Sequence, residues 1–117
     1  RNTIELLPTT VAGRKVRYVV LDDATDTTAA VRNARKLVTE DKVDVIIGPT
    51  VTPTSLAMLE VIGPAETPMI SLAGSSVIAH PVEGHKRWAF KLAPNEPLMA
   101  ARVFEHATNN NVKTIAY

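Results

Sequence analysis

The sequence predicts an α/β fold in which a parallel sheet is flanked by helices. Short apolar segments rich in β-branched residues alternate along the chain with longer segments whose apolar residues have helical spacing. The apolar run Val45–Ile47 does not alternate with polar residues, which is typical of a strand covered on both faces. Glycine, proline and hydroxyl residues separate these segments, as expected for turns and helix starts.

The composition supports one packed domain and excludes several classes of function. Of the 117 residues, 45% are apolar and 21% charged, which is enough apolar surface for a core. The 13 basic and 12 acidic residues are interspersed, so nothing indicates binding to nucleic acid or to an anionic membrane. The absence of cysteine excludes disulfides, thiolate catalysis and thiolate metal sites, and no motif indicates a cofactor. No apolar run approaches the ~20 residues of a membrane span.

The first part of the chain is expected to contain one strand and one helix. Residues 2–7 resemble the end of a helix, and residues 8–15 form a connection that turns at Gly13. The segment VRYVVL at residues 16–21 predicts a strand. The helix that follows has an apolar face with the i, i+3/i+4, i+7 spacing, made of Ala30, Val31, Ala34, Leu37 and Val38.

The second part predicts three strands and two helices. The strands are expected at residues 43–47, 68–72 and 88–92. Thr52 is expected to cap a helix whose first helical residue is Pro53. The apolar residues of that helix are Leu56, Leu59 and Ile62. A last helix is expected to begin at Asn95-Glu96-Pro97 and to turn Ala101, Phe104, and Ala107 or Thr108 inward.

Three predicted strands end in polar residues that are candidates for a ligand site: Asp22-Asp23, residues 48–52 and residues 73–76. Ligands of open parallel sheets bind beyond the carboxyl ends of the strands. One such end, residues 48–52, combines a glycine turn, two threonines and a helix N-terminus, which suits a carboxylate or phosphate. A second, residues 73–76, offers backbone groups and hydroxyls. The residues alone leave purely structural roles open, because Thr52 would serve as a helix cap and residues 73–76 as a tight turn.

The remaining polar clusters are expected to be structural. Asp22, Asp23 and Asp26 lack the glycine and the closing glutamate of a calcium loop, so a helix cap and a solvated loop are the preferred interpretation. The three histidines, His80, His85 and His106, show no spacing typical of metal ligands. We therefore predict no metal site.

The order of the motifs resembles the leucine/isoleucine/valine-binding proteins, which are type I periplasmic solute-binding proteins of ABC importers. The matching segments are VVLDDATD (19–26), the helix after it, VIIGP (45–49), the hydroxyl-rich loop 50–55 and PMISLAGSS (68–76). The resemblance implies a two-lobed protein that closes on an amino acid or related carboxylate and delivers it to a membrane permease. It also implies a periplasmic location, or an extracellular lipid-anchored one in a Gram-positive cell, a signal peptide in the precursor, and no enzymatic activity.

Matched by position, the resemblance places five residues at the ligand. Thr52 and Ser75 would each offer a hydroxyl and a backbone N–H, Ala73 would offer its carbonyl, and Val51 and Leu72 would lie alongside. Thr52 and Ser75 stand where the family often has serine and threonine respectively, so donor chemistry is retained.

Residues 1–117 are expected to form a partial N-terminal lobe, because the family's first strand and its whole second lobe have no counterpart here. Loss of a central strand would leave an unpaired slot between residues 16–21 and 43–47, which predicts strand exchange between copies or completion by further chain.

Alternatives from other classes share this fold. They are a binder of aromatic or other small carboxylates, and the effector-sensing domain of a transcription regulator or receptor. A receiver-type phosphotransfer domain would use Asp22-Asp23, Ser71 and Lys91 with Pro94. The strand ending at Ile47 is followed by Gly48-Pro49 and lacks the phosphoacceptor aspartate.

Overall fold

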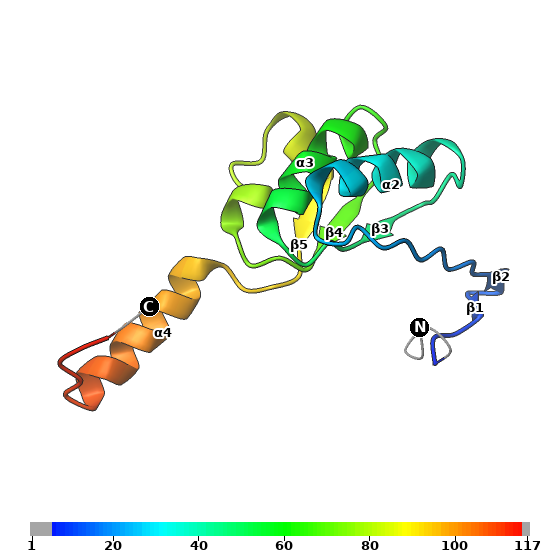
Figure 1. Cartoon of the computed structure of the whole chain (residues 1–117). Coiled ribbons are helices and arrows are strands. Elements are labelled where there is room, and N and C mark those ends of the chain that lie inside the picture. Colours follow the sequence, from blue (N-terminus) through cyan, green and yellow to red (C-terminus); the bar gives the residue numbers. More distant parts are fainter. Residues whose placement is uncertain (1–5, 116–117) are drawn as a thin grey trace.

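The computed structural model describes residues 6–115, and Figure 1 shows their arrangement. An α/β body lies in the middle, a small hairpin of β1 (Thr10–Val11) and β2 (Arg14–Lys15) lies beside it, and the last helix, α4 (Glu96–Asn109), projects away. The predicted helix end at residues 2–7 falls mainly outside the described residues, as does the end of the chain at residues 116–117.

The body is built on a parallel three-stranded sheet. Its strands are β3 (Ile46–Ile47), β4 (Met69–Ser71) and β5 (Ala89–Lys91), in the order β3-β4-β5. Ile46 pairs with Met69, which in turn pairs with Ala89. These strands are shorter than predicted but lie in the predicted segments, and their parallel pairing confirms the expected fold class.

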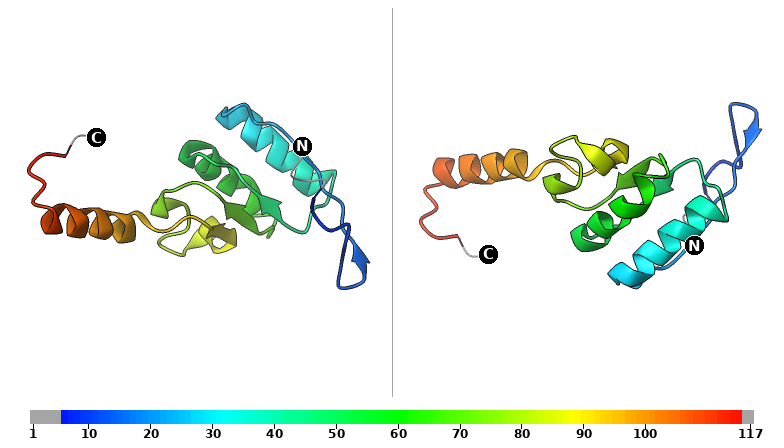
Figure 2. Two further views of the ribbon diagram at one scale, coloured as in Figure 1. Left: turned by 90° about the horizontal axis from the view of Figure 1, so that it is seen from below. Right: turned by 90° about the horizontal axis from the view of Figure 1, so that it is seen from above.

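Two helices cover one face of this sheet. Helix α2 (Thr27–Thr39) and helix α3 (Thr52–Ile62) lie side by side (Figure 2). Asp26 caps α2 by accepting a hydrogen bond from the Ala29 amide at 2.7 Å, as predicted for the acidic cluster. The side chains that meet between helices and sheet form the core: Ala30, Ala34, Ile46, Met58, Leu59, Ile62, Met69, Ala73, Ile78 and Ala89.

The opposite face of the sheet is largely exposed in the described part of the chain, with only Ile70 of its central strand half-buried. Ile47 is 69% exposed and Phe90 is 53% exposed, whereas their neighbours Ile46 and Ala89 are buried. The expectation that both faces of this strand are covered is therefore wrong for the described chain. The run Val45–Ile47 places apolar side chains on both faces of the sheet, but only one face packs against helices in the described chain.

Helix α3 begins one residue earlier than predicted. Val51 is its N-cap, with extended backbone angles, and Thr52 is already helical, with Pro53 after it. The predicted cap at Thr52 is wrong because the Val51 carbonyl makes the first helical bond, accepting from the Ser55 amide at 3.2 Å. Thr52 therefore does not act as the N-cap of α3.

Residues 16–21 do not form the predicted strand. A strand requires a hydrogen-bonded neighbour, and within the described chain this segment has none in the sheet. It is held instead by Arg17, which donates to the carbonyl of Asp41 at 2.6 Å, while the Lys36 ammonium bonds to the Asp41 carboxylate at 2.6 Å. The hydrogen bond from Lys36 lowers the pKa of Asp41. In the described sheet β3 is an edge strand, with β4 as its neighbour on one side.

The last helix does not turn its apolar side inward. Of the residues predicted to turn inward, Phe104 is 65% exposed, Ala101 and Thr108 are exposed, and Ala107 is half-buried, so this face of α4 is largely uncovered among the described residues. The amphipathic pattern is real, but the covering surface is not in this part of the chain. No helix within residues 6–115 combines the length and apolarity that a bilayer crossing requires.

The connections differ from prediction in detail. Residues 8–15, expected to be a plain connection, contain the β1–β2 hairpin, and its turn uses Gly13 at φ +77° as expected. Two short 3₁₀ helices, η1 (Ser76–Ile78) and η2 (Gly84–Trp88), lie between β4 and β5, so Trp88 ends a helix rather than beginning a strand.

Candidate ligand site

The loops after β3 and β4 leave the sheet at the same edge and are bonded to each other. The Gly48 amide donates to the Ile70 carbonyl at 2.9 Å, and the Leu72 amide donates to the Pro49 carbonyl at 3.0 Å. Because the two strands are parallel neighbours, their carboxyl ends emerge together. The structure therefore brings residues 48–52 and 72–75 to one rim, as the sequence predicted.

The first turn of α3 is organised around the carbonyl of Val51. It accepts from the hydroxyls of Thr54 and Ser55, each at 3.0 Å. Thr52 is half-buried, and neither its hydroxyl nor its amide bonds to another described residue. The positive end of the α3 dipole and this unused donor pair thus lie at the rim.

Ser55 and Ser71 lie beneath the rim; sequence reasoning assigned Ser71 a role only in the phosphotransfer alternative and assigned Ser55 none. Both are fully buried, and their hydroxyl oxygens are 2.8 Å apart. The Ser71 hydroxyl also accepts from the Ala73 amide at 3.2 Å. This bonding and burial argue against the phosphotransfer interpretation, which requires Ser71 to be reachable by a phosphoryl group.

The residues of the loop after β4 differ in their exposure to solvent. Ser75 is half-buried and begins η1 as its N-cap, while Leu72 is 37% exposed. Val51, across from this loop, is half-buried. Ala73 has an exposed fraction of 0%. A role for its carbonyl at a ligand therefore requires the loop to open.

Glu96 and Lys91 approach this loop from the segment that leads into α4, and sequence reasoning gave neither a place at the ligand site. Glu96 Oε2 accepts from the Ser76 amide at 2.7 Å. The Ser76 hydroxyl, the backbone amides of Glu96 and Ser76, and the Ser75 hydroxyl together lower the pKa of Glu96 to about 2. The Lys91 ammonium donates to the carbonyls of Gly74 and Pro94. No sequence pattern predicts the contacts of Glu96 with Ser76 and of Lys91 with Gly74, because they join residues 20 and 17 positions apart.

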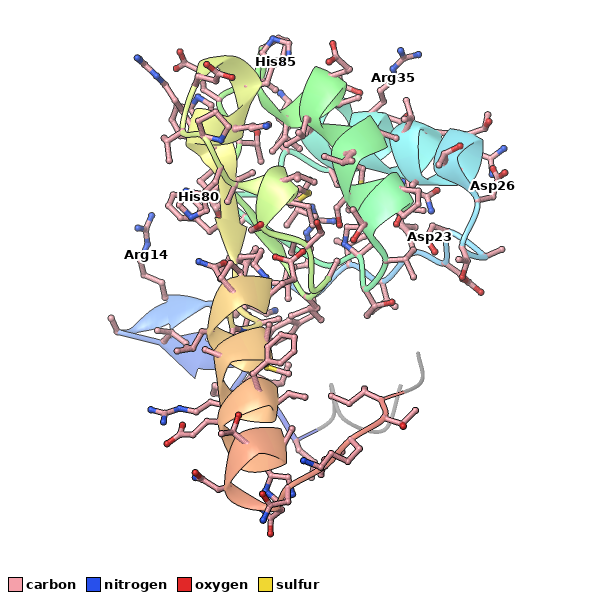
Figure 3. All side chains as sticks on the ribbon, turned by 90° about the vertical axis from the view of Figure 1, so that its left-hand side faces the viewer. Arg14, Asp23, Asp26, Arg35, His80 and His85 are labelled. Atoms are coloured by element: carbon pink, nitrogen blue, oxygen red, sulfur yellow. The ribbon has the colours of Figure 1, made fainter. Side chains whose placement is uncertain are left out.

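The other polar candidates lie away from the rim. Figure 3 shows Asp23 and Asp26 near one end of α2, well separated from His80 and His85. The carboxylates of Asp22 and Asp23 each accept a backbone amide two residues further on, as in a loop turn, while Asp26 provides the helix cap. Within residues 6–115, no group of three potential metal ligands is found.

Two open hollows in the described part of the molecule do not coincide with this rim. The larger, of about 690 Å³, lies along the outward face of α2, and the smaller, of about 370 Å³, lies beside β5. Thr52 and Ser75 line neither hollow. No described segment faces the rim from the other side, so the rim encloses no cavity. The candidate site is therefore defined by the two hydrogen-bonded loops.

A parallel sheet whose adjacent strand ends form one polar rim defines an α/β domain of the ligand-binding kind. The family described as periplasmic binding protein matches residues 5–117. The chain belongs to the periplasmic binding protein family, and the resemblance drawn from its motifs is confirmed.

Solved structures agree with this assignment. An extracellular ligand-binding receptor from Rhodopseudomonas palustris HaA2 is 37% identical, with a TM-score of 0.87 over 93% of this chain and 30% of that chain. A solute-binding protein of an ABC transporter from Rhodopseudomonas palustris BisB5, in complex with 3,4-dihydroxybenzoic acid, is 29% identical, with a TM-score of 0.80 over 90% of this chain and 28% of that one.

A leucine-binding protein from Thermotoga maritima shares the fold at 23% identity, with a TM-score of 0.75 over 87% of this chain and 28% of that chain. Among curated proteins, none matches significantly. The chain thus spans less than a third of the length of these structures.

Proposed function

We propose that this chain supplies the carboxylate-binding half of a solute site in a periplasmic or extracellular binding protein of an ABC importer. The observation that carries the proposal is the shared rim, where the bonded loops after β3 and β4 place the start of α3 beside residues 72–75. Thr52 and Ser75 each provide a hydroxyl and an amide, and Ala73 provides its carbonyl once the loop opens. Val51 and Leu72 lie alongside the ligand. The role is binding, without catalysis.

The proposed ligand is a branched-chain or related amino acid. A second candidate is an aromatic carboxylate, which is favoured by the 3,4-dihydroxybenzoic acid bound to a relative at 29% identity. Both ligands present a carboxylate to the same donors. A second lobe would bind the rest of the ligand and determine its identity. The binding protein would then deliver the ligand to a membrane permease.

The energy balance implies that this half-site binds weakly by itself. Charge-assisted hydrogen bonds contribute about 1.5–3 kcal/mol each, and a helix N-terminus contributes up to about 2 kcal/mol. Immobilising a ligand costs about 4–15 kcal/mol. Two or three contacts therefore barely offset that cost, and closure of a second lobe would have to supply the remaining contacts.

The test is an amide NMR titration of this chain with L-leucine and, separately, with 3,4-dihydroxybenzoate. We expect the Thr52 and Ser75 amides to shift, with saturation only in the millimolar range or above (about −4 kcal/mol or weaker). Thr52→Val should reduce the shifts at the rim, whereas Thr28→Val, an exposed control on α2, should leave them unchanged. Shifts confined to other regions, or submillimolar binding, would refute this half-site.

The effector-sensing alternative predicts a different assembly. A regulator would carry a DNA-binding segment ahead of residue 1, and an importer component would carry a secretory leader. Expression of the gene's complete product, followed by cell fractionation, separates the two, since recovery with nucleoid DNA would contradict the transport role.

A further inference from the structure

The loop Ala73–Ser76 is tied at two points to the segment that joins β5 to α4. Glu96 Oε2 lies 2.7 Å from the Ser76 amide nitrogen. Lys91 donates to the Gly74 carbonyl, and its second bond, to the Pro94 carbonyl, is 3.2 Å long. One carboxylate and one ammonium thus join the second rim loop to both ends of residues 92–95.

These polar contacts lie where α4 meets the body. Along α4 only Ala107 is even half-buried, so apolar packing by the described residues does not set the direction of this helix (Figure 1). Glu96 is the first residue of α4, and Lys91 is the last residue of β5. The direction in which α4 leaves the body therefore depends on residues 92–95 and on the contacts that fix their ends.

We propose that Glu96 is a positioning residue that, with Lys91, couples the conformation of the loop Ala73–Ser76 to the orientation of α4. Ser75 and Ser76 are consecutive, so a ligand that draws the Ser75 amide toward the rim moves the amide that Glu96 holds. Movement of α4 would displace the loop by the same route. The link to ligand occupancy rests on the proposed function, whereas the link between Glu96, Ser76 and α4 does not.

The charge distribution around Glu96 favours this contact. The loop Ala73–Ser75 and η1 carry no titratable side chain, and Lys91 is the charged group that β5 brings to the loop. The remaining ionisable side chains of α4, those of Arg102, Glu105 and His106, lie at least six residues further along, roughly 9 Å up the helix axis. The carboxylate also lies in the first turn of α4, where the helix dipole stabilises negative charge.

The first experiment follows the Ser76 amide proton by NMR from about pH 2 to about pH 7. In the wild-type chain its shift should titrate with Glu96, and in Glu96→Gln that titration should disappear. Glu96→Asp, one methylene shorter, should retain part of it. Glu105→Gln is the matched control, because Glu105 bonds to Arg102 at 2.6 Å and does not reach the loop. A Ser76 titration that persists in Glu96→Gln would overturn the contact.

The second experiment measures residual dipolar couplings for the amides of α4 and of the body. In the wild-type chain the α4 couplings should fit the alignment of α2 and α3. In Glu96→Gln they should fall toward zero while the α2 and α3 couplings are retained, which shows that the body is still folded. Unchanged α4 couplings in Glu96→Gln would overturn the positioning role.

Addition of millimolar L-leucine separates the two proposals. If the rim amides shift and the α4 couplings change with them, the coupling is supported. If the rim amides shift while the α4 couplings stay constant, the coupling is refuted and the proposed function survives. If no rim amide shifts with L-leucine or with 3,4-dihydroxybenzoate, the proposed function fails and so does the ligand-linked part of this inference. The Glu96–Ser76–α4 link is then decided by the two preceding experiments.

Discussion

The hydroxyl oxygens of Ser55 and Ser71 lie 2.8 Å apart in the fully buried space beneath the candidate site. Ser55 belongs to the first turn of α3, and Ser71 is the last residue of β4. Because Ser55 also donates to the Val51 carbonyl and Ser71 accepts the Ala73 amide, this pair connects the two rim loops from below.

Replacing Ser71 with alanine should destabilise the chain by about 1–3 kcal/mol, because buried polar groups lose their partners. The Ala73 amide would lose its acceptor and the Ser55 hydroxyl would lose a partner. Urea unfolding followed by circular dichroism measures the change. The effects of Ser55→Ala and Ser71→Ala should not add in the double variant, since both remove the same bond. Strict additivity would show that the two hydroxyls act independently.

Gly63→Ala should destabilise the chain, also by about 1–3 kcal/mol, through overpacking. A Cβ at this position would lie 2.5 Å from both Cβ and Cγ of His85. The nearest atoms belong to the base of the histidine side chain, so rotation of its ring does not relieve the contact. Gly74→Ala is the matched control, because nothing lies within 4 Å of its added Cβ. Equal melting temperatures for the two variants would contradict the tight contact between α3 and η2.

The Glu96 contact should contribute stability that depends on pH. Its pKa is about 2 in the folded chain, below the ordinary 4.5, chiefly because the ionised carboxylate accepts hydrogen bonds from Ser76. A depressed folded-state pKa means that the contribution is complete above about pH 4.5 and is lost as the pH falls toward 2. The effect should be modest because the group is solvent-exposed.

The measurement compares urea midpoints of the wild-type chain and Glu96→Gln at several pH values. We expect the wild-type advantage to shrink as the solution is acidified through this range. A difference that is constant, or that grows in acid, would show that Glu96 does not act as an ionised acceptor.

The free outer edge of β3, whose backbone groups have no strand partner in the described sheet, should make this chain self-associate. Residues 16–21 and the outer edge of β3 lack strand partners among the described residues, and Val20 is 59% exposed. Exposed strand edges pair with other chains. Size-exclusion chromatography with light scattering should therefore show oligomers through strand exchange. Val20→Lys should reduce association, whereas Thr28→Val on α2 should not. A well-folded monomer at high concentration would contradict the expectation that the sheet lacks a central strand next to β3.

The sequence determined the three strands of the parallel sheet, the helices α2, α3 and α4, and the order of these elements along the chain. Helical spacing predicted both α2 and α3, since the apolar stripe at Ala30 and Ala34 and that at Leu59 and Ile62 each define one buried face. The parallel alternation also placed Thr52 and Ser75 at one edge of the sheet, because that follows from topology alone.

Only the tertiary structure decided which apolar residues are covered and which polar groups meet. Residues 16–21 have the composition of a strand, but strand formation depends on a neighbour that composition does not reveal. Phe104 has helical spacing, but burial needs a facing surface, and none is present among residues 6–115. The Ser55–Ser71 pair and the Glu96–Ser76 contact join segments 16 and 20 residues apart, so they arise from the packing of the chain and leave no local pattern.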